Sequence, residues 1–419
     1  MQHIVIIGAG QAGAQTLISL RQGGFDGTIS LIGDEPALPY QRPPLSKKFL
    51  AGEMEKAQLF FRPQAFYDKE NIALYLGQRA EKIDPAAKIV TLTDGTELTY
   101  TQLMLSLGSR PRTLPIADTD YQNLFDIRTI ADIEAIRPHF TAGKKLVIIG
   151  GGYIGLETAA VAQQMGLDTI IIEAAERILA RVASPQIADF YERIHNEKGV
   201  QIITNMQVTE FATQNNGKNE NENKISELRL SNGRTLAADL VVAGIGIVPN
   251  VELAEKAGLK IDNGIVVDEF ARTSITDIYA GGDCTQHPNA LLGRRLRLES
   301  VQNAIAQGKT AAAHILGEAK AYAEIPWFWS DQYDIKLQMA GLAIDYDRII
   351  LRGDDNTNSF ALFYFNKTQL IAADAINRPA EFMAAKKLIH VAAEKNIQID
   401  PAQLGDETSA PKDWVRTYR

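Results

Sequence analysis

Cysteine is almost missing from the sequence: Cys284 is the only one in 419 residues. A single thiol cannot form an internal disulfide, and it cannot build a zinc or iron–sulfur site from thiolates. We therefore expect no metal site, and we expect any redox chemistry to depend on a bound organic cofactor.

Long apolar runs and an excess of positive charge are also missing. No stretch approaches the roughly 18 apolar residues of a membrane span, and the apolar start MQHIVIIGAG stops at Gly8 without a charged leader or cleavage site. The net charge of -8 argues against a nucleic-acid-binding protein. These absences predict a cytoplasmic protein that contacts neither membrane nor nucleic acid.

Glycine, in contrast, is placed in a clear pattern near the N-terminus. Residues 3–35 contain a β-branched run, a glycine turn, an amphipathic run and a second apolar strand, as in one βαβ unit. Gly8, Gly10 and Gly13 match G-x-G-x-x-G, and Asp34 follows at about the 20-residue distance typical of a ribose-binding acid. This pattern predicts a dinucleotide-binding site.

The same pattern occurs a second time, in KLVIIGGGYIGLETAAVAQQMGLDTIIIEAAE. Gly150, Gly152 and Gly155 take the glycine positions, and Glu173 closes the second strand. Each copy is followed by a turn dipeptide, Asp94-Gly95 or Asn232-Gly233, and then by an apolar strand ending in glycine. The polar run at residues 214–224 is interpreted as the tip of a hairpin. The sequence therefore predicts two complete dinucleotide-binding domains of one design.

Two dinucleotide sites without a metal favour a resident flavin and a visiting nicotinamide. A carboxylate at the end of the second strand accepts hydrogen bonds from ribose hydroxyls and repels a 2′-phosphate, so Glu173 favours NADH over NADPH. Arg177 and Arg181 follow closely and keep a phosphate-tolerant site open as an alternative.

Six segments together resemble the FAD-dependent, NADH-using ferredoxin reductases of bacterial oxygenase systems: GAGQAG, PYQRPPLSKKFLAGE, LVIIGGGYIGLE, AGIGIVPN, IYAGGDC and PWFWSDQY. The resemblance covers nearly the whole chain. It implies an α/β protein of the glutathione-reductase type, with two Rossmann-like domains and a C-terminal α+β domain. The implied boundaries are 1–111 and 244–321 for the FAD domain, 112–243 for the NADH domain and 322–419 for the C-terminal domain.

The resemblance also implies which residues bind each cofactor. For FAD they are Gly8, Gly10, Ala12, Gly13, Asp34, Arg42, Lys47, Ala80, Arg128, Asp283 and Val301. For NADH they are Gly150, Gly152, Tyr153, Ile154, Gly155, Glu173, Gly244, Ile245 and Gly246, with Arg181 beside them. Lys47 and Glu157 are expected to form an ion pair near the flavin, although an unpaired lysine at a helix start is the simpler alternative. Trp329 is expected to line the electron exit.

Members of this family take a hydride from NADH and pass single electrons to a [2Fe–2S] ferredoxin. Disulfide reductases of the same fold carry C-x-x-x-x-C where this chain has PPLSKKF, so the acceptor is expected to be a docking protein. Arg294, Arg295 and Arg297 form a basic cluster that either binds an acidic ferredoxin or is an ordinary solvated loop. Two alternatives stay open: a rubredoxin or small-molecule reductase, and an NADH-sensing flavoprotein resembling apoptosis-inducing factor.

Overall fold

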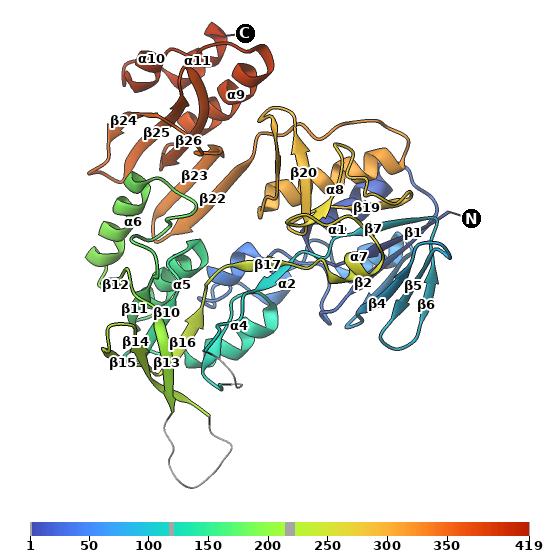
Figure 1. The fold of residues 1–419 in the computed structure, drawn as a ribbon, viewed down its shortest axis with the longest axis horizontal. Helices are drawn as coiled ribbons and strands as arrows, with labels where there is room; N and C mark the ends of the chain where they lie inside the picture. The colour runs from blue at the N-terminus through green and yellow to red at the C-terminus, as the bar shows by residue number, and fades with distance from the viewer. Residues whose placement is uncertain (1, 117–120, 214–222, 419) are drawn as a thin grey trace.

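A computed structural model describes residues 2–116, 121–213 and 223–418 (Figure 1). The first of its larger sheets, here called the N-terminal sheet, is parallel, in the order β19-β7-β1-β2-β3. Its strands are β1 (His3–Ile7), β2 (Thr28–Gly33), β3 (Ile72–Leu76), β7 (Gln102–Leu105) and β19 (Ile278–Ala280). Parallel neighbours require a crossover, and α1 (Gln11–Gln22) supplies the one between β1 and β2. It buries Ala14, Leu17 and Leu20 and packs against α8 (Val301–Ile315).

The second large sheet, the central sheet, is also parallel, in the order β12-β11-β10-β16-β9. It comprises β9 (Leu124–Phe125), β10 (Lys145–Ile149), β11 (Asp168–Ile172), β12 (Gln201–Ile203) and β16 (Leu240–Ala243). Helix α5 (Tyr153–Gln164) connects β10 to β11, and α6 (Pro185–Glu197) connects β11 to β12. Because β10 lies between β11 and β16 as β1 lies between β2 and β7, the two predicted βαβ units have equivalent surroundings.

A small antiparallel sheet is inserted into each parallel sheet, between β3 and β7 in the first and between β12 and β16 in the second. The strands are β4 (Ala80–Asp84), β5 (Ile89–Leu92) and β6 (Glu97–Thr99), and then β13 (Val208–Thr213), β14 (Ile225–Leu230) and β15 (Thr235–Ala237). Gly95 and Gly233 turn their hairpins at φ +84° and +85°, where glycine is favoured. This confirms the predicted hairpins. Most of the polar run at 214–224 lies outside the described residues.

The chain leaves the N-terminal sheet and later returns to it. β8 (Ser109–Pro111) and β17 (Ile247–Pro249) pair antiparallel between the two parallel sheets, and β19 then joins the N-terminal sheet beside β7 (Figure 1). This interruption agrees with the fold that the resemblance implies.

The third large sheet, the C-terminal sheet, is antiparallel, in the order β22-β23-β26-β25-β24. Its strands are β22 (Trp327–Gln332), β23 (Ile335–Gly341), β24 (Arg348–Asp354), β25 (Ser359–Asn366) and β26 (Gln369–Ile376). Helices α9 (Pro379–Lys395), α10 (Pro401–Gly405) and α11 (Pro411–Thr417) follow it. The α/β architecture with an α+β C-terminal part is therefore as predicted.

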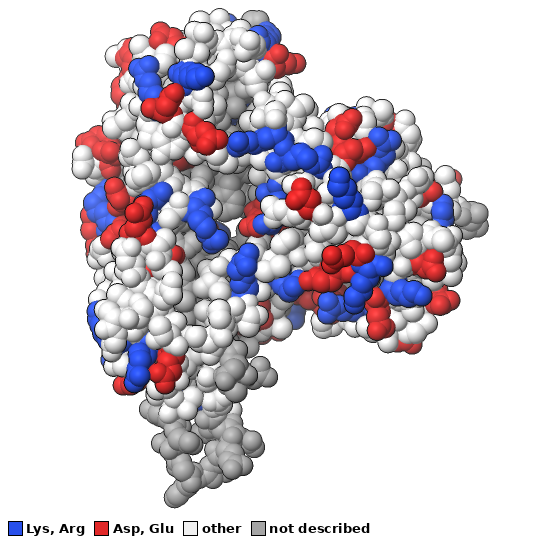
Figure 2. Space-filling model, in the orientation of Figure 1, with Lys and Arg blue, Asp and Glu red and all other residues white. Residues whose placement is uncertain are grey.

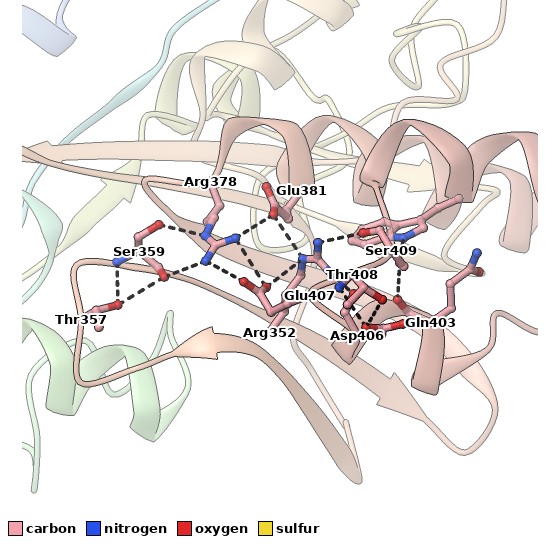
Figure 3. Close-up of polar contacts among 11 residues, drawn as sticks. Arg352, Thr357, Ser359, Arg378, Glu381, Gln403, Asp406, Glu407, Thr408 and Ser409 are labelled. Carbon is pink, nitrogen blue, oxygen red and sulfur yellow. Dashed lines mark hydrogen bonds and ion pairs between the residues drawn. The ribbon is translucent and has the colours of Figure 1, made fainter.

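Arg352 ties the last helices to this sheet (Figure 3). Its buried guanidinium donates to Glu381 Oε1 at 3.2 Å, to Ser409 O at 2.9 Å and to Asp406 O, and it lies over the Trp414 ring. Arg378 shares the carboxylates of Glu381 and Glu407.

The remaining elements are shorter. They are η1 (Pro43–Ser46), α2 (Lys56–Leu59), α3 (Gln64–Lys69), α4 (Ile130–Ile136), η2 (Arg137–His139), α7 (Glu252–Lys256), β18 (Ile265–Val266), β20 (Thr285–Asn289) and β21 (Arg294–Leu296). Within the described ranges, none of the helices combines the length and apolar character needed to cross a bilayer.

One apolar core joins the three parts of the molecule. It includes Leu45 and Phe49 near η1, Leu156 of α5, and Leu337 and Phe360 of the C-terminal sheet. This shared core fixes η1 against α5, and the candidate active site is built around that contact.

Candidate active site

The first glycine loop presses closely on the end of the N-terminal sheet. Gly8 has φ +106°, and a Cβ there would lie 2.1 Å from Ser106 O. A Cβ on Gly13 would lie 2.0 Å from Gly8 O, so neither position accepts a side chain. Gly10 is different, because no atom lies within 4 Å of where its Cβ would be. The loop is therefore tight on the sheet side and open at the start of α1.

The second glycine loop repeats this geometry. Gly150 has φ +111°, and its Cβ would lie 2.3 Å from Gly244 O. A Cβ on Gly155 would lie 2.2 Å from Gly150 O, while the position above Gly152 is open.

The helices that follow the two loops also share an uncapped start. Helices α4, α6 and α8 have side-chain N-caps from Thr129, Ser184 and Ser300, whereas α3, α7, α9 and α11 have none. Neither α1, after Gly10, nor α5, after Gly152, has a side-chain cap. Free N–H groups and a positive dipole end beside open space fit the pyrophosphate of a dinucleotide. Both loops therefore pass a test of fit to such a ligand.

The two predicted ribose acids stand at the ends of β2 and β11. Asp34 is exposed after β2. Glu173 accepts hydrogen bonds from the backbone N–H groups of Gly151 at 2.7 Å and Ala175 at 2.8 Å. The carboxylate of Glu173 thus lies directly at the second glycine loop, where a ribose is expected.

Arg42, Arg128 and Asp283 form a connected group of charged side chains near the predicted FAD site. Arg42 binds Glu35 at 2.7 Å and the Tyr40 hydroxyl at 3.0 Å, and it also reaches the carbonyl of Arg128. Arg128 lies 3.6 Å from Asp283, whose carboxylate accepts from Ser109 Oγ at 2.8 Å. Burial, followed by the nearby charge of Arg42, lowers the pKa of Arg128. Such a guanidinium pair suits an anionic ligand.

Ala12, Ala80 and Val301 have no polar side chain and take their places through packing. Ala12 is buried on α1, 3.2 Å from where a Cβ on Gly282 would stand. Ala80 begins β4, and Val301 begins α8.

Lys47 and Glu157 form the ion pair that the sequence predicts. Lys47 Nζ lies 2.6 Å from Glu157 Oε2, and their side chains are 19% and 2% exposed. Glu157 also accepts from Ser46 Oγ at 2.6 Å and from Ser330 Oγ at 2.6 Å. The alternative of an unpaired, exposed lysine at this position is wrong. The catalytic role of the pair stays a prediction.

Aromatic side chains from β22 border the start of α5. The Tyr153 ring lies 4.9 Å from that of Phe328, and its hydroxyl donates to Met339 Sδ at 3.0 Å. Trp329, partly exposed, lies 5.6 Å from the Trp327 ring. Ile154 is 45% exposed, so its side chain is accessible to a ligand bound at the second glycine loop.

The end of β16 completes the second site. Gly244 closes on Gly150, and Gly246, at φ +104°, lies near two guanidiniums. The Nη2 atom of Arg181 would be 3.3 Å from a Cβ on Gly246, and Arg112 Cδ would be 3.7 Å from it. Arg177 instead donates to the carbonyls of Ile178 and Ala180, so Arg181 and Arg112 are the cations placed near Gly246.

The basic cluster on β21 and at the residue after it has internal partners. Arg294 pairs with Asp345 at 3.3 Å, and Arg297 pairs with Glu299 at 2.5 Å. Arg295 donates to the carbonyls of Val267 and Gln286. The side chains of Arg294 and Arg297 are 45% and 15% exposed, so Arg294 is the more accessible of the two.

Sequence reasoning missed several residues at these sites: Ser46, Ser106, Ser109, Arg112 and Ser330. Ser46 and Ser330 stand inside the quoted segments PPLSK and PWFWSDQY, but nothing in their spacing indicates a common carboxylate. Cys284 is buried within the fold, and burial raises the pKa of its thiol to about 11. This thiol is therefore not a reactive group.

Comparisons with known proteins agree with this geometry. Residues 2–308 match the family described as pyridine nucleotide-disulphide oxidoreductase, and residues 327–415 match the reductase C-terminal family. Putidaredoxin reductase of Pseudomonas putida is 41% identical over 99% of this chain and 96% of its own length. The ferredoxin–NAD(+) reductase component of an anthranilate 1,2-dioxygenase system in Burkholderia cepacia is 41% identical over 98% of both chains. A crystal structure of a covalent putidaredoxin reductase–putidaredoxin complex superimposes with a TM-score of 0.95, at 40% identity, over 100% of this chain and 99% of that one.

Proposed function

The chain belongs to the pyridine nucleotide-disulphide oxidoreductase family, and from this premise we propose that it is a ferredoxin–NAD(+) reductase of an oxygenase system. The observation that carries the proposal is the pair of open glycine loops before uncapped helices, in a protein whose one thiol is buried. Such a protein binds two dinucleotides and has no disulfide of its own to reduce.

FAD and NADH are the cofactors of this reaction. The FAD site comprises Gly8, Gly10, Ala12, Gly13, Asp34, Arg42, Lys47, Ala80, Arg128, Asp283 and Val301, with Trp329 at its edge. The NADH site comprises Gly150, Gly152, Tyr153, Ile154, Gly155, Glu173, Arg181, Gly244 and Gly246. When bound, FAD supplies the change from two-electron hydride chemistry to single-electron transfer, which no side chain of this protein provides.

The side chains orient the cofactors and set the local charge. The N–H groups at the starts of α1 and α5 hold the two pyrophosphates, and Asp34 and Glu173 accept from ribose hydroxyls. Lys47 holds positive charge beside the site, and Glu157 fixes its position through a 2.6 Å contact. Tyr153 and Phe328 pack against each other at the start of α5, where their rings would limit the access of water to the second glycine loop.

The partner in this proposal is an acidic [2Fe–2S] ferredoxin that docks transiently. Figure 2 shows Lys and Arg side chains bordering the hollow between the C-terminal part and the part that contains β1. Arg294, Arg295 and Arg297 contribute positive charge that attracts such a partner, and Arg294 is placed to exchange Asp345 for an acidic residue of the ferredoxin. We place the reaction in the cytoplasm and retain the domain boundaries 1–111, 112–243, 244–321 and 322–419.

Reduction of cytochrome c by NADH, with and without candidate ferredoxins, tests the proposal. We expect turnover only when a ferredoxin is present. Negligible turnover with every ferredoxin would contradict the proposal, while turnover with rubredoxin or a quinone alone would support the first alternative. Slow NADH oxidation with a long-lived reduced complex would instead indicate an NADH-sensing flavoprotein.

A further inference from the structure

A line of buried hydrogen bonds leads from Glu157 away from the cofactor sites. Ser330 Oγ lies 2.6 Å from Glu157 Oε1, and Gln332 Nε2 lies 3.1 Å from Ser330 Oγ. Gln332 Oε1 lies 2.8 Å from His195 Nε2, and the Tyr333 hydroxyl lies 3.2 Å from His195 Nδ1. The line thus connects α5, β22 and α6.

The direction of every bond in this line follows from the carboxylate at its start. An ionised Glu157 only accepts, so the one hydroxyl proton of Ser330 is donated to it. Ser330 Oγ must then accept from the Gln332 amide NH₂, which turns Gln332 Oε1 toward His195. His195 must donate from Nε2, and its Nδ1 must accept from the Tyr333 hydroxyl. One proton arrangement satisfies all of these groups.

The surroundings of His195 are consistent with this arrangement. His195 and Ser330 are 0% exposed, Gln332 is 1% exposed and Glu157 is 2% exposed. Burial lowers the pKa of His195 to about 4, so its ring is neutral near pH 7. A neutral ring has one donor and one acceptor nitrogen, as the line requires.

Tyr333 provides a second, independent observation. It stands in the turn between β22 and β23 with φ +55°. A bulky side chain is rarely found in this left-handed region, and such residues persist only where other interactions hold them. The contact with His195 is such an interaction, and Tyr333 closes the end of the line.

We propose that His195, Gln332 and Ser330 are positioning residues that fix the orientation of the Glu157 carboxylate, and through it the position of Lys47. This inference rests on the proposed function, because it gives Lys47 its role beside the flavin. Without the Nε2–H of His195, the Gln332 amide is free to rotate and present Oε1 to Ser330. Ser330 then donates to Gln332, and Glu157 Oε1 loses its donor.

The test compares three variants of the flavin-loaded protein. His195→Leu removes the donor, whereas His195→Gln keeps an amide N–H near the position of Nε2. Ser184→Ala is the control for a general loosening of α6, because it removes the side-chain N-cap of this helix and its 2.8 Å bond to the Tyr364 hydroxyl of the C-terminal sheet. We expect His195→Leu to make the flavin midpoint potential more negative and to slow flavin reduction by NADH about tenfold. We expect His195→Gln to recover most of the loss and Ser184→Ala to leave both quantities unchanged.

Lys47→Met separates this inference from the proposed function. If Lys47→Met shifts the potential and His195→Leu does not, the positioning role is wrong while the proposed function stands. If neither variant shifts it, the role of Lys47 fails and the positioning role fails with it. An equal loss in Ser184→Ala would show that the effect is only structural and would also overturn the inference.

Nitrogen-15 NMR of histidine-labelled protein gives a readout that does not depend on activity or on the folding of a variant. We expect His195 to be neutral at pH 7, with its proton on Nε2. A ring protonated on Nδ1, or on both nitrogens, would overturn the inference.

Discussion

Lys47 Nζ lies 2.6 Å from Glu157 Oε2, although Lys47 stands at the end of η1 and Glu157 stands on α5, 110 residues further along the chain. Glu157 is buried, and it also accepts hydrogen bonds from Ser46 and Ser330. A buried carboxylate with three donors is held in one orientation. The cation is consequently fixed at the junction of all three parts of the molecule.

Replacing Lys47 by Met should make the flavin midpoint potential more negative, because a positive charge beside the site is lost. It should also slow the reduction of the flavin by NADH, followed as bleaching of the flavin absorbance, about tenfold or more. The variant also leaves Glu157 buried without its counter-ion, at a cost of about 3–5 kcal/mol in unfolding free energy. Adding Glu157→Gln should restore stability but not the rate. Lys48→Met, at the exposed next position, is the control, and an unchanged potential in Lys47→Met would contradict the assigned role.

Replacing Glu173 by Ala should change the choice of nicotinamide. We expect kcat/KM for NADH to fall about ten- to a hundredfold, because a charge-assisted hydrogen bond to the ribose is lost. We expect the NADPH to NADH ratio to rise, since Arg181 remains near the site. Steady-state kinetics with both nucleotides measure this, with Glu176→Ala in the same exposed loop as the control. A ratio that does not move would exclude Glu173 from ribose binding.

Reversing the charge of Arg294 should weaken docking of the ferredoxin. We expect KM for the ferredoxin to rise several-fold at low ionic strength, and the effect to diminish as salt screens the charge. NADH-dependent reduction of ferricyanide, which needs no docked protein, should stay the same. Arg229→Glu is a matched control because Arg229 is also exposed and paired, with Glu210 at 3.2 Å. An unchanged KM for the ferredoxin at every salt concentration would show that Arg294 does not contribute to docking.

Replacing Arg352 by Met should loosen the C-terminal helices. The variant leaves Glu381 buried with Arg378 alone and frees the carbonyls of Asp406 and Ser409 (Figure 3). We expect a loss of about 3–5 kcal/mol in unfolding free energy. Urea unfolding followed by tryptophan fluorescence reports on this part, because Trp327, Trp329 and Trp414 all lie in it. Arg348 is exposed on the same strand, so Arg348→Met should leave the free energy of unfolding nearly unchanged. Equal losses of stability in the two variants would refute the role of Arg352 in holding the C-terminal helices.

Asp374 should make the stability fall as pH rises from about 4 to about 7. Burial raises the pKa of Asp374 from 3.8 to about 7, against a 2.6 Å hydrogen bond from Tyr364. The unfolded chain therefore loses this proton first, and the folded state is destabilised by up to about 4 kcal/mol above pH 7. Asp374→Asn should flatten this dependence in urea titrations at pH 5 and 8. The exposed Asp334→Asn should retain it, and an unchanged slope in Asp374→Asn would contradict the assignment.

The glycine positions were predictable because their requirement is local. Gly8 and Gly150 have positive φ, and a Cβ atom added to either residue would lie within 2.3 Å of a carbonyl oxygen. Only glycine avoids both the strained φ and this clash. The amphipathic run predicted after the first glycine turn is also confirmed, as helix α1 (Gln11–Gln22). Its pattern is set by neighbours three and four residues apart.

The contacts of Glu157 were only partly predictable. The family motif that contains Glu157 predicted its contact with Lys47. Ser330, however, is 173 residues away on an antiparallel strand, and the pattern of polar and apolar residues in that strand does not indicate a contact with Glu157. The same holds for His195, which reads as an ordinary helix residue until β22 is placed against α6.

The sequence by itself determined two dinucleotide-binding units, the lack of a redox disulfide and the family, because each depends on residue types at short, fixed spacings. Only the tertiary structure decided that Glu157 also accepts from Ser46 and Ser330, and that Arg294, Arg295 and Arg297 are engaged within the chain. The contacts of Glu157 join segments far apart in the sequence, and they exist only after the shared apolar core has packed the segment around η1 against the central and C-terminal sheets.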